Sequence, residues 1–221
     1  MPNLALLGYG KMGRMLDQFA PEYGFNVICR RDIHREESLT GADVAIEFST
    51  PSAVLGNVKL AVDAGIPVVI GTTGWLDCLD EVKALTQSTG AVWSPNYSVG
   101  VNVFFRVIQE AARLLKDEEE YGAWAWEIHH HTKKDAPSGT LLKLVEEMRS
   151  AGFARPIDVS SNRAGAHPGT HEIGFDSAAD TITLRHSARS REGFARGALK
   201  AAQWIAGRKG FHDFKEVLFG G

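Results

Sequence analysis

A glycine-rich segment near the start of the chain, Gly8-Tyr-Gly-Lys-Met-Gly13, constrains the fold more than any other feature. It directly follows the apolar run Leu4–Leu7, which reads as a buried strand, and it opens the helix-like segment Lys11–Phe19. This order of strand, loop and helix is the context that the dinucleotide-binding fingerprint requires. The first glycine permits the tight turn, the second lets backbone approach a pyrophosphate, and the third lets the helix lie close to the strand. Free N–H groups at the helix N-terminus would face the pyrophosphate, so we expect a bound dinucleotide.

Short apolar runs alternate with helix-like segments through the rest of the N-terminal half. They read as strands at Asn26–Cys29, Val44–Phe48, Val68–Ile70 and Ala91–Trp93. Strands separated by helices predict a parallel sheet with helices on its faces.

Two polar loops follow predicted strands at the carboxyl edge of this sheet, where open parallel sheets bind their ligands. They are Phe48-Ser-Thr-Pro51 and Gly71-Thr-Thr-Gly74. Glycines and small hydroxyl residues would let backbone and Oγ groups approach a nicotinamide ribose or amide. Ordinary turns favour the same residue types, so turn chemistry remains an alternative for each loop.

The second predicted strand ends in Arg30-Arg31-Asp32. An arginine at this point accommodates the 2′-phosphate of NADPH, whereas an acidic residue binds the ribose 2′-hydroxyl of NADH. Because arginine comes first, the sequence favours NADPH, and Asp32 keeps NADH open. Two solvated arginines at a strand end are the alternative.

The hydrophobic period changes in the second half of the chain. Helices are predicted at 101–115, 141–148 and 194–205, strands at 124–130 and 181–186, and a loop-rich stretch at 155–171. We therefore predict an α/β fold. A Rossmann-type parallel-sheet nucleotide-binding domain takes residues 1–98 and 195–221, with the C-terminal helix packing back on it, and a smaller α+β domain takes residues 99–194.

The balance of charge argues against nucleic acid or an anionic membrane as a partner. The chain has 24 basic and 27 acidic residues and a net charge of −3, so any anion would need a local basic site. The N-terminal segment lacks the features of a secretory signal, and no run of 18 apolar residues could span a bilayer. Cys29 and Cys78 make no disulfide framework. We expect a cytoplasmic protein.

The segment Glu127–Thr140, EIHHHTKKDAPSGT, concentrates polar chemistry at a predicted strand end. In a strand His129 and His131 would share one face, as a metal site needs, with His167, His171 or His186 as a third ligand. Lys133 and Lys134 follow at once and would repel a cation. We therefore expect no metal and an anion in its place.

The end of this segment, Asp135-Ala-Pro-Ser-Gly-Thr140, reads as a turn into a helix that begins between Pro137 and Thr140. Free N–H groups there and the Lys133 ammonium would form a pocket for a carboxylate or phosphate. A neighbouring imidazole could donate a proton near neutral pH. An exposed polar strand end with a capped helix is the simpler alternative.

Taken whole, Glu127–Thr140 resembles the signature of the 4-hydroxy-tetrahydrodipicolinate reductase family, the second enzyme of the diaminopimelate route to lysine. The resemblance runs the length of the chain. It also includes the glycine loop and the segments at 71–74, 94–102, 163–171 and 186–198. The signature is specific to the family, whereas the glycine loop is shared by many dehydrogenases.

The resemblance implies roles for the matching residues. The proton donor of the family falls on His129, its catalytic lysine on Lys133 and its substrate-binding histidine on His130. Gly139 and Thr140 match backbone amides that hold a substrate carboxylate. The implied cofactor contacts are Gly8, Tyr9, Gly10, Lys11, Met12, Gly13, Arg30 or Arg31, Phe48, Gly71, Thr72, Thr73, Ser94, Pro95, Asn96 and Tyr97.

The implied activity is reduction of a small cyclic imine that carries two carboxylates, with NADPH or NADH as the reductant. The resemblance further implies a homotetramer assembled through the sheets of the second domain. Three alternatives differ in what they require. Another NAD(P)-dependent reductase would need a different catalytic segment, a non-catalytic redox sensor would need a basic face or a recognition helix, and a hydrolase would need a metal.

Overall fold

The structure, a computed structural model, describes residues 1–220 and divides into two compact units. Unit 1 combines Met1–Val99 with the chain from Glu192 onward, and unit 2 is Gly100–Arg191. Unit 1 is therefore built from two separate stretches of the sequence. Within residues 1–220, no helix is both long enough and apolar enough to cross a membrane.

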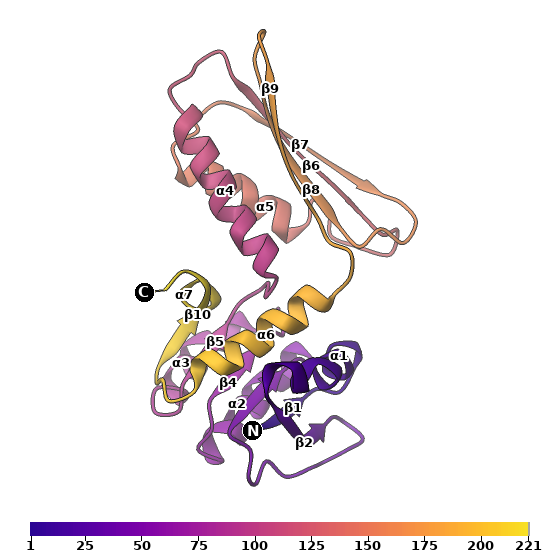
Figure 1. Ribbon diagram of the computed structural model, residues 1–221, viewed down its shortest axis with the longest axis vertical. Coiled ribbons are helices and arrows are strands. Elements are labelled where there is room, and N and C mark those ends of the chain that lie inside the picture. The colour runs from indigo at the N-terminus through magenta and orange to yellow at the C-terminus, as the bar shows by residue number, and fades with distance from the viewer. Residues whose placement is uncertain (221) are drawn as a thin grey trace. The chain divides into compact units, whose positions relative to one another are not determined.

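Unit 1 is built around a parallel sheet, as the sequence predicts. Its strands are β1 (Asn3–Leu7), β2 (Asn26–Arg31), β3 (Val44–Glu47), β4 (Val68–Ile70), β5 (Ala91–Trp93) and β10 (Phe211–Asp213), in the order β10-β5-β4-β3-β1-β2 (Figure 1). All neighbouring pairs are parallel. The direction of winding reverses between β1 and β3, where open sheets of this type bind ligands. The sequence does not predict β10, because Phe211-His-Asp213 is not an apolar run, unlike the equally short β4 and β5.

Helices cover both faces of this sheet. On one face lie α1 (Lys11–Phe19), α6 (Glu192–Ile205) and α7 (Phe214–Phe219), and on the other lie α2 (Val54–Asp63) and α3 (Leu79–Leu85). Short 3₁₀ turns occur at η1 (Ala20–Tyr23), η2 (Pro51–Ala53) and η3 (Leu76–Cys78). Successive side chains of a strand point to opposite faces, so Leu4 and Leu6 join the first core and Ala5 and Leu7 the second.

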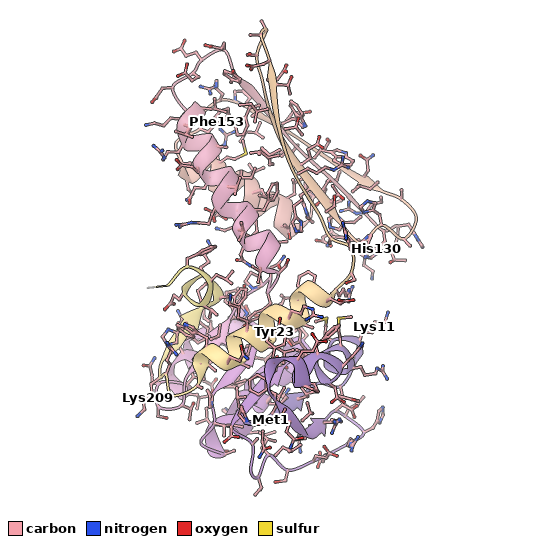
Figure 2. All side chains as sticks on the ribbon, viewed as in Figure 1. Met1, Lys11, Tyr23, His130, Phe153 and Lys209 are labelled. Atoms are coloured by element: carbon pink, nitrogen blue, oxygen red, sulfur yellow. The ribbon has the colours of Figure 1, made fainter. Side chains whose placement is uncertain are left out.

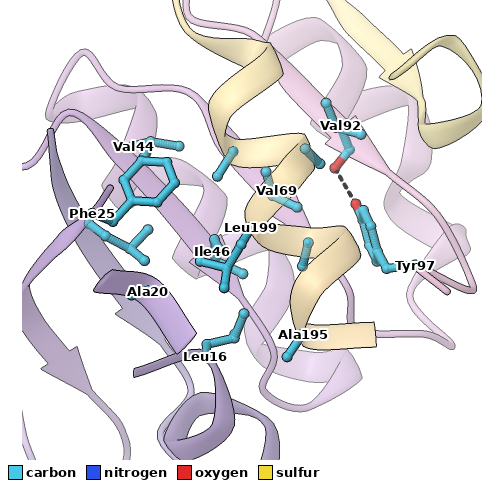
Figure 3. Packing of buried hydrophobic residues seen from close by; sticks show 14 of the residues in the cluster. Leu16, Ala20, Phe25, Val44, Ile46, Val69, Val92, Tyr97, Ala195 and Leu199 are labelled. Atoms are coloured by element: carbon cyan, nitrogen blue, oxygen red, sulfur yellow. Dashed lines mark hydrogen bonds between the residues drawn. The ribbon is translucent and has the colours of Figure 1, made fainter. Parts of the chain in front are cut away.

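Helix α6 returns the C-terminal part of the chain to the first of these faces. Figure 3 shows Ala195 and Leu199 of α6 beside Leu16 of α1 and Ile46 of β3, within one buried cluster. The approach is close at Gly197, where a Cβ atom would overlap the main-chain carbonyl of residue 97. Glycine is therefore required there for packing.

Unit 2 consists of a mixed sheet and two helices. Its strands are β6 (Gly122–His129), β7 (Ile157–Arg163), β8 (Thr170–Asp176) and β9 (Thr181–Ser187), in the order β7-β6-β8-β9, and its helices are α4 (Val99–Leu115) and α5 (Gly139–Ser150). β7 runs parallel to β6, and the other pairs are antiparallel. Phe105, Leu144 and Ile173 are among the residues that form the core between helices and sheet. The predicted fold class, a Rossmann-type sheet plus a smaller α+β part, is confirmed.

The expectation of a loop-rich stretch at 155–171 is wrong for Ile157–Arg163, which forms β7. This strand lies at the sheet edge and pairs only with β6 in the described part of the chain. Its alternate residues are exposed, and the sequence is correspondingly polar. The hydrophobic contrast that identifies a strand is therefore weak here.

We predict that Gly197→Ala lowers the free energy of unfolding by about 1–3 kcal/mol, because the added methyl group must push α6 away from the main chain beneath it. The matched control is Gly193→Ala on the same helix, whose Cβ would meet the Ser98 hydroxyl at an ordinary 3.4 Å. Urea unfolding followed by circular dichroism measures both. Equal stability of the two variants would contradict the packing argument.

Candidate active site

The glycine loop of unit 1 has the backbone shape that a pyrophosphate needs. Gly8 has φ of +102°, and its N–H donates to the Arg31 carbonyl over 2.8 Å. A Cβ at Gly8 would overlap the Phe48 carbonyl, and one at Gly13 would overlap the Gly8 carbonyl, so both contacts require glycine. Around Gly10, in contrast, no described residue other than its two chain neighbours comes within 4 Å of a Cβ position.

Helix α1 begins directly after Gly10. Gly10 is its N-cap residue, and in the described residues no side chain caps the helix and no acidic residue lies in its first turn. Its first N–H groups are thus available to an anion, and the partial positive charge of the helix end favours one. The residues of the loop therefore fit the diphosphate of a dinucleotide.

The two polar loops at the carboxyl edge of the sheet are joined to one another. Ser49 N–H donates to the Thr72 hydroxyl over 2.8 Å, and the Phe48 ring lies over Gly71, where a Cβ would overlap it. Beneath them the buried Glu47 carboxylate accepts from the Ser49 hydroxyl and from Asn57 Nδ2. Burial raises the pKa of Glu47. Sequence analysis missed this residue, although an acidic residue ending an apolar strand is unusual.

The segment 94–97 does not present all of its side chains to a ligand. Ser94 Oγ donates to the Asn96 carbonyl over 2.9 Å and so shapes the turn. The Tyr97 ring is buried in the core of unit 1 (Figure 3), with its hydroxyl 2.9 Å from the Val92 carbonyl and its ring centroid 4.8 Å from that of Phe214. A contact of Tyr97 with a cofactor would therefore involve its main chain.

Arg30 and Arg31, which the sequence left as alternatives, have different surroundings. Arg30 makes a two-pronged ion pair with Asp17 of α1, at 2.7 and 2.8 Å, and the Tyr9 hydroxyl donates to the same carboxylate. This pairing raises the pKa of Arg30 further above its ordinary value. Arg31 Nη1 donates to the Glu37 carbonyl over 3.0 Å, and its Nη2 lies 3.8 Å from the Glu36 carboxylate.

The centre of the candidate site in unit 2 is Glu127, a carboxylate with no solvent exposure. Its Oε1 accepts from Ser138 N–H at 2.8 Å, from the Ser161 hydroxyl at 3.0 Å and from Arg163 Nη2 at 3.0 Å. Its Oε2 accepts from the Ser138 hydroxyl and lies 3.4 Å from His171 Nε2. Burial alone would raise the pKa of Glu127, but the donors from His171, Ser138 and Arg163 together lower it strongly.

Ser138 connects this carboxylate to helix α5. As the N-cap residue of α5, Ser138 accepts from Leu141 N–H at 3.2 Å, while its own N–H and hydroxyl donate to Glu127. This helix start lies within the interval predicted from Pro137 to Thr140. Glu127 therefore sets the position of the helix end whose first residues are Gly139 and Thr140.

His129 is the last residue of β6 and is buried next to Glu127. Its Nδ1 lies 3.4 Å from Glu127 Oε2, without hydrogen-bonding geometry to any described residue, and its ring centroid is 5.0 Å from that of His171. The ring fills the space that a side chain on Gly169 would occupy. Burial lowers the pKa of His129 to about 4, Glu127 opposes this fall, and His171, Lys133 and Arg163 add to it. The neutral imidazole therefore predominates near neutral pH, because burial disfavours the charged form.

The remaining predicted residues of the segment lie at its surface. His130 follows the strand end (Figure 2), and its Nδ1 is 2.7 Å from the Thr132 hydroxyl. Lys133 Nζ is paired with Asp135, at 2.7 and 2.8 Å from the two carboxylate oxygens. Gly139 is exposed, with no atom of the described chain within 4 Å of a Cβ position. Arg163 donates to the main-chain carbonyls of residues 133 and 135 and so holds the loop.

One group of side chains has the spacing of a metal site. Ligand atoms of Glu127, His129 and His171 lie within 4.8 Å of one another. Arg163 and Ser138 already bind the Glu127 carboxylate, and the guanidinium charge opposes a cation. The pair of His129 with His131 considered from the sequence is not formed. The strand ends at His129, and the exposed His131 has its Nδ1 2.8 Å from the Gly165 carbonyl.

Comparison with known proteins decides the family. The family profile described as dihydrodipicolinate reductase, C-terminus, matches residues 100–218, and the N-terminus profile matches residues 22–97. The chain belongs to the dihydrodipicolinate reductase family. The family predicted from the signature is therefore confirmed, and its reductant is NAD(P)H.

Relatives in this family match over the whole chain. The 4-hydroxy-tetrahydrodipicolinate reductase of Christiangramia forsetii is 34% identical over 232 residues, covering 98% of this chain and 97% of the relative. That of Methanosarcina mazei is 34% identical over 241 residues, covering 99% and 89%. The predicted activity, an oxidoreductase of diaminopimelate and lysine biosynthesis, is confirmed on this basis.

The fold comparison agrees with the family. A dipicolinate-bound dihydrodipicolinate reductase from Paenisporosarcina sp. TG-14 has a TM-score of 0.79 at 21% identity, with 98% of each chain covered. An amine dehydrogenase from Mycobacterium smegmatis has a TM-score of 0.60 at 9% identity and covers 95% and 93%. At these identities the likeness shows the fold alone. Membership in the reductase family excludes the redox-sensor and hydrolase alternatives.

We predict that Glu127→Ala lowers the free energy of unfolding by about 3–5 kcal/mol, because it leaves Arg163 unpaired in a mostly buried position. Glu127→Gln should lower the free energy of unfolding by less, since the amide retains hydrogen bonding to Ser138. Glu172→Ala on neighbouring β8 is the control, because its ion pair with Arg185 is wide at 3.7 Å and worth less than about 1 kcal/mol. Denaturant unfolding of the three variants gives the values, and equal losses for Glu127→Ala and the control would contradict the central role of the carboxylate.

Proposed function

We propose that unit 1 binds the nicotinamide cofactor at the carboxyl edge of its parallel sheet and that unit 2 binds the cyclic dicarboxylate substrate at Glu127–Thr140. One observation carries this assignment. The Glu127 carboxylate lies beside the buried His129 imidazole and holds the N-terminus of α5, and the charge of the Lys133 ammonium acts on the same imidazole. Together these groups supply a proton donor and two kinds of hydrogen-bond donor for a substrate carboxylate.

Lys133 and the N-terminus of α5 bind one substrate carboxylate. The Gly139 and Thr140 amides are the first of the helix, and a glycine in open space at this point lets a ligand reach the backbone. The ammonium adds charge to the hydrogen bonds. His130, partly exposed beside this pocket, contacts the ring or its second carboxylate.

His129 is the proton donor. In the substrate-free protein its pKa of about 4 leaves roughly one molecule in a thousand protonated at pH 7. A bound dianion stabilises the imidazolium and raises this pKa, so the acid is formed only when substrate is present. Glu127, 3.4 Å from Nδ1, favours the same charged form.

The reduced nicotinamide, when bound, supplies hydride to ring carbon 4 of the conjugated imine that remains after loss of water. Negative charge then moves toward the ring nitrogen and gives an enamine-like intermediate. Lys133 stabilises this charge through the carboxylate, and His129 protonates the neighbouring carbon. The remaining contribution of the chain is to hold the substrate ring in a reactive geometry.

Arg31 is the residue that recognises a 2′-phosphate, and the preferred cofactor is NADPH. Arg31 is favoured over Arg30 for this role because two hydrogen bonds engage the Arg30 guanidinium with Asp17. Arg31 lies at the carboxyl end of β2, opposite Leu7, and its carbonyl holds the Gly8 turn. The nearby Glu36 carboxylate weakens the preference for NADPH, so the enzyme also accepts NADH.

The homotetramer implied by the resemblance stays a prediction. Helices α4 and α5 cover one face of the unit 2 sheet. The other face carries Trp126, whose indole N–H donates to Asn162 and whose ring lies under Arg185. A sheet face with large aromatic side chains suits association with a second copy.

An assay that couples the protein to the preceding synthase, with pyruvate and aspartate semialdehyde, tests the function through oxidation of NADPH or NADH.

We predict that Arg31→Ala reduces kcat/KM for NADPH by roughly 10–100-fold, as expected for loss of a charged hydrogen bond, and leaves kcat/KM for NADH nearly unchanged. Arg113→Ala, which removes an equal charge from the exposed pair on α4, is the control. An equal loss with both cofactors would reject Arg31 as the phosphate contact.

The protonation state of His129 predicts a distinctive pH dependence. The transition state carries one proton more than the free enzyme, so kcat/KM should fall about tenfold per pH unit between about pH 5 and 7. The kcat value should stay level until the raised pKa of the complex is reached. His129→Gln should reduce kcat by roughly 10²–10⁴-fold and abolish the slope. A slope that persists in the variant would place the proton on another group.

A further inference from the structure

We propose that Asp135 is an internal competitor for the substrate carboxylate and thereby an affinity-determining residue of this enzyme. The inference rests on the proposed function, which assigns a carboxylate site to Lys133 and the α5 N-terminus. In the structure the Lys133 ammonium is bound by Asp135 instead. Lys133 Nζ lies 2.7 and 2.8 Å from its two oxygens, and the Gly139 backbone makes a smaller contribution to the lowered pKa of the Asp135 carboxyl.

The chemistry of Asp135 matches that of the group it would be exchanged for. In the proposed site a substrate carboxylate binds the Lys133 ammonium, and the Asp135 carboxylate binds the same ammonium. The Lys133 ammonium, chiefly, lowers the pKa of Asp135, so the side chain is an anion throughout the neutral range. The site therefore holds a carboxylate of its own before the substrate arrives.

The ion pair between Lys133 and Asp135 can be exchanged for one between Lys133 and a ligand. The Lys133 side chain is 24% exposed and that of Asp135 is 56% exposed, and ion pairs this exposed contribute little to stability. The main chain of the loop is held separately, because Arg163 donates to the carbonyls of residues 133 and 135 while it pairs with Glu127. Rotation of the Asp135 side chain can thus open the site without moving the backbone.

Two consequences follow for recognition. A ligand must bring its own negative charge to replace Asp135, so neutral analogues of the substrate are disfavoured. After the exchange the displaced carboxylate remains in the same short loop, where it repels a bound dianion. Both effects weaken binding of substrate and product and assist product release.

The alternative is that Asp135 only orients the Lys133 ammonium. The two roles predict opposite changes when the charge is removed. A competitor that is neutralised leaves Lys133 ready for the ligand, so binding tightens. An orienting residue that is neutralised leaves Lys133 mobile, so binding weakens.

The test measures binding of pyridine-2,6-dicarboxylate, a planar dicarboxylate, to the full chain by titration calorimetry at low and high salt. Asp135→Asn and Asp135→Ala are compared with wild type, and Asp158→Asn, an exposed carboxylate on β7, is the control for net charge. We expect about two- to fivefold tighter binding in both Asp135 variants at low salt, a smaller gain at high salt, and no gain in the control. Thermal melting of each variant verifies the fold.

Lys133→Ala separates failure of this inference from failure of the proposed function. If Lys133→Ala weakens binding while the Asp135 variants bind no better than wild type, Asp135 is not a competitor and the carboxylate site stands. If Lys133→Ala binds as tightly as wild type, the carboxylate site itself is rejected. In the double variant Lys133→Ala/Asp135→Asn, Asp135→Asn should increase the affinity for pyridine-2,6-dicarboxylate by a smaller factor than in wild type, because no Lys133 ammonium is left to release.

Discussion

The site in unit 2 depends on one buried negative charge. A carboxylate without solvent exposure is unfavourable unless donors surround it, and Glu127 is surrounded by groups from β7, β8 and the start of α5. The same bonds that stabilise the charge bring these elements together. The charge also lies beside His129 and anchors the N-terminus of α5, where the substrate carboxylate is proposed to bind. Structure and reactivity are coupled through a single side chain.

His129 and Lys133, which lie near each other in the proposed site, differ in how deeply they are buried. His129 is buried, so its charge state responds strongly to what binds beside it, whereas the Lys133 side chain is 24% exposed. A buried acid that is neutral at rest cannot protonate solvent or pair permanently with Glu127. An exposed ammonium can capture an anion before the ligand is fully seated. Each position suits the task assigned to the residue.

Much of the fold could be predicted because the parallel strands are continuous apolar runs and α1 and α4 keep a helical period. Polar strands such as β7 and β10 lack that signal. The signature also located the region around His129 and Lys133. What it could not give is environment: the lowered pKa of His129, the role of Glu127 and the core position of Tyr97 all depend on residues distant in sequence.

The division of unit 1 between two stretches of the chain has a consequence for biosynthesis. Helix α6 and strand β10, which complete one face and one edge of its sheet, are translated after all of unit 2. The continuous segment 100–191 can form its own core as soon as it leaves the ribosome. The stretch Met1–Val99 keeps an uncovered apolar surface until α6 and β10 have been made, so removal of these two elements would damage all of unit 1.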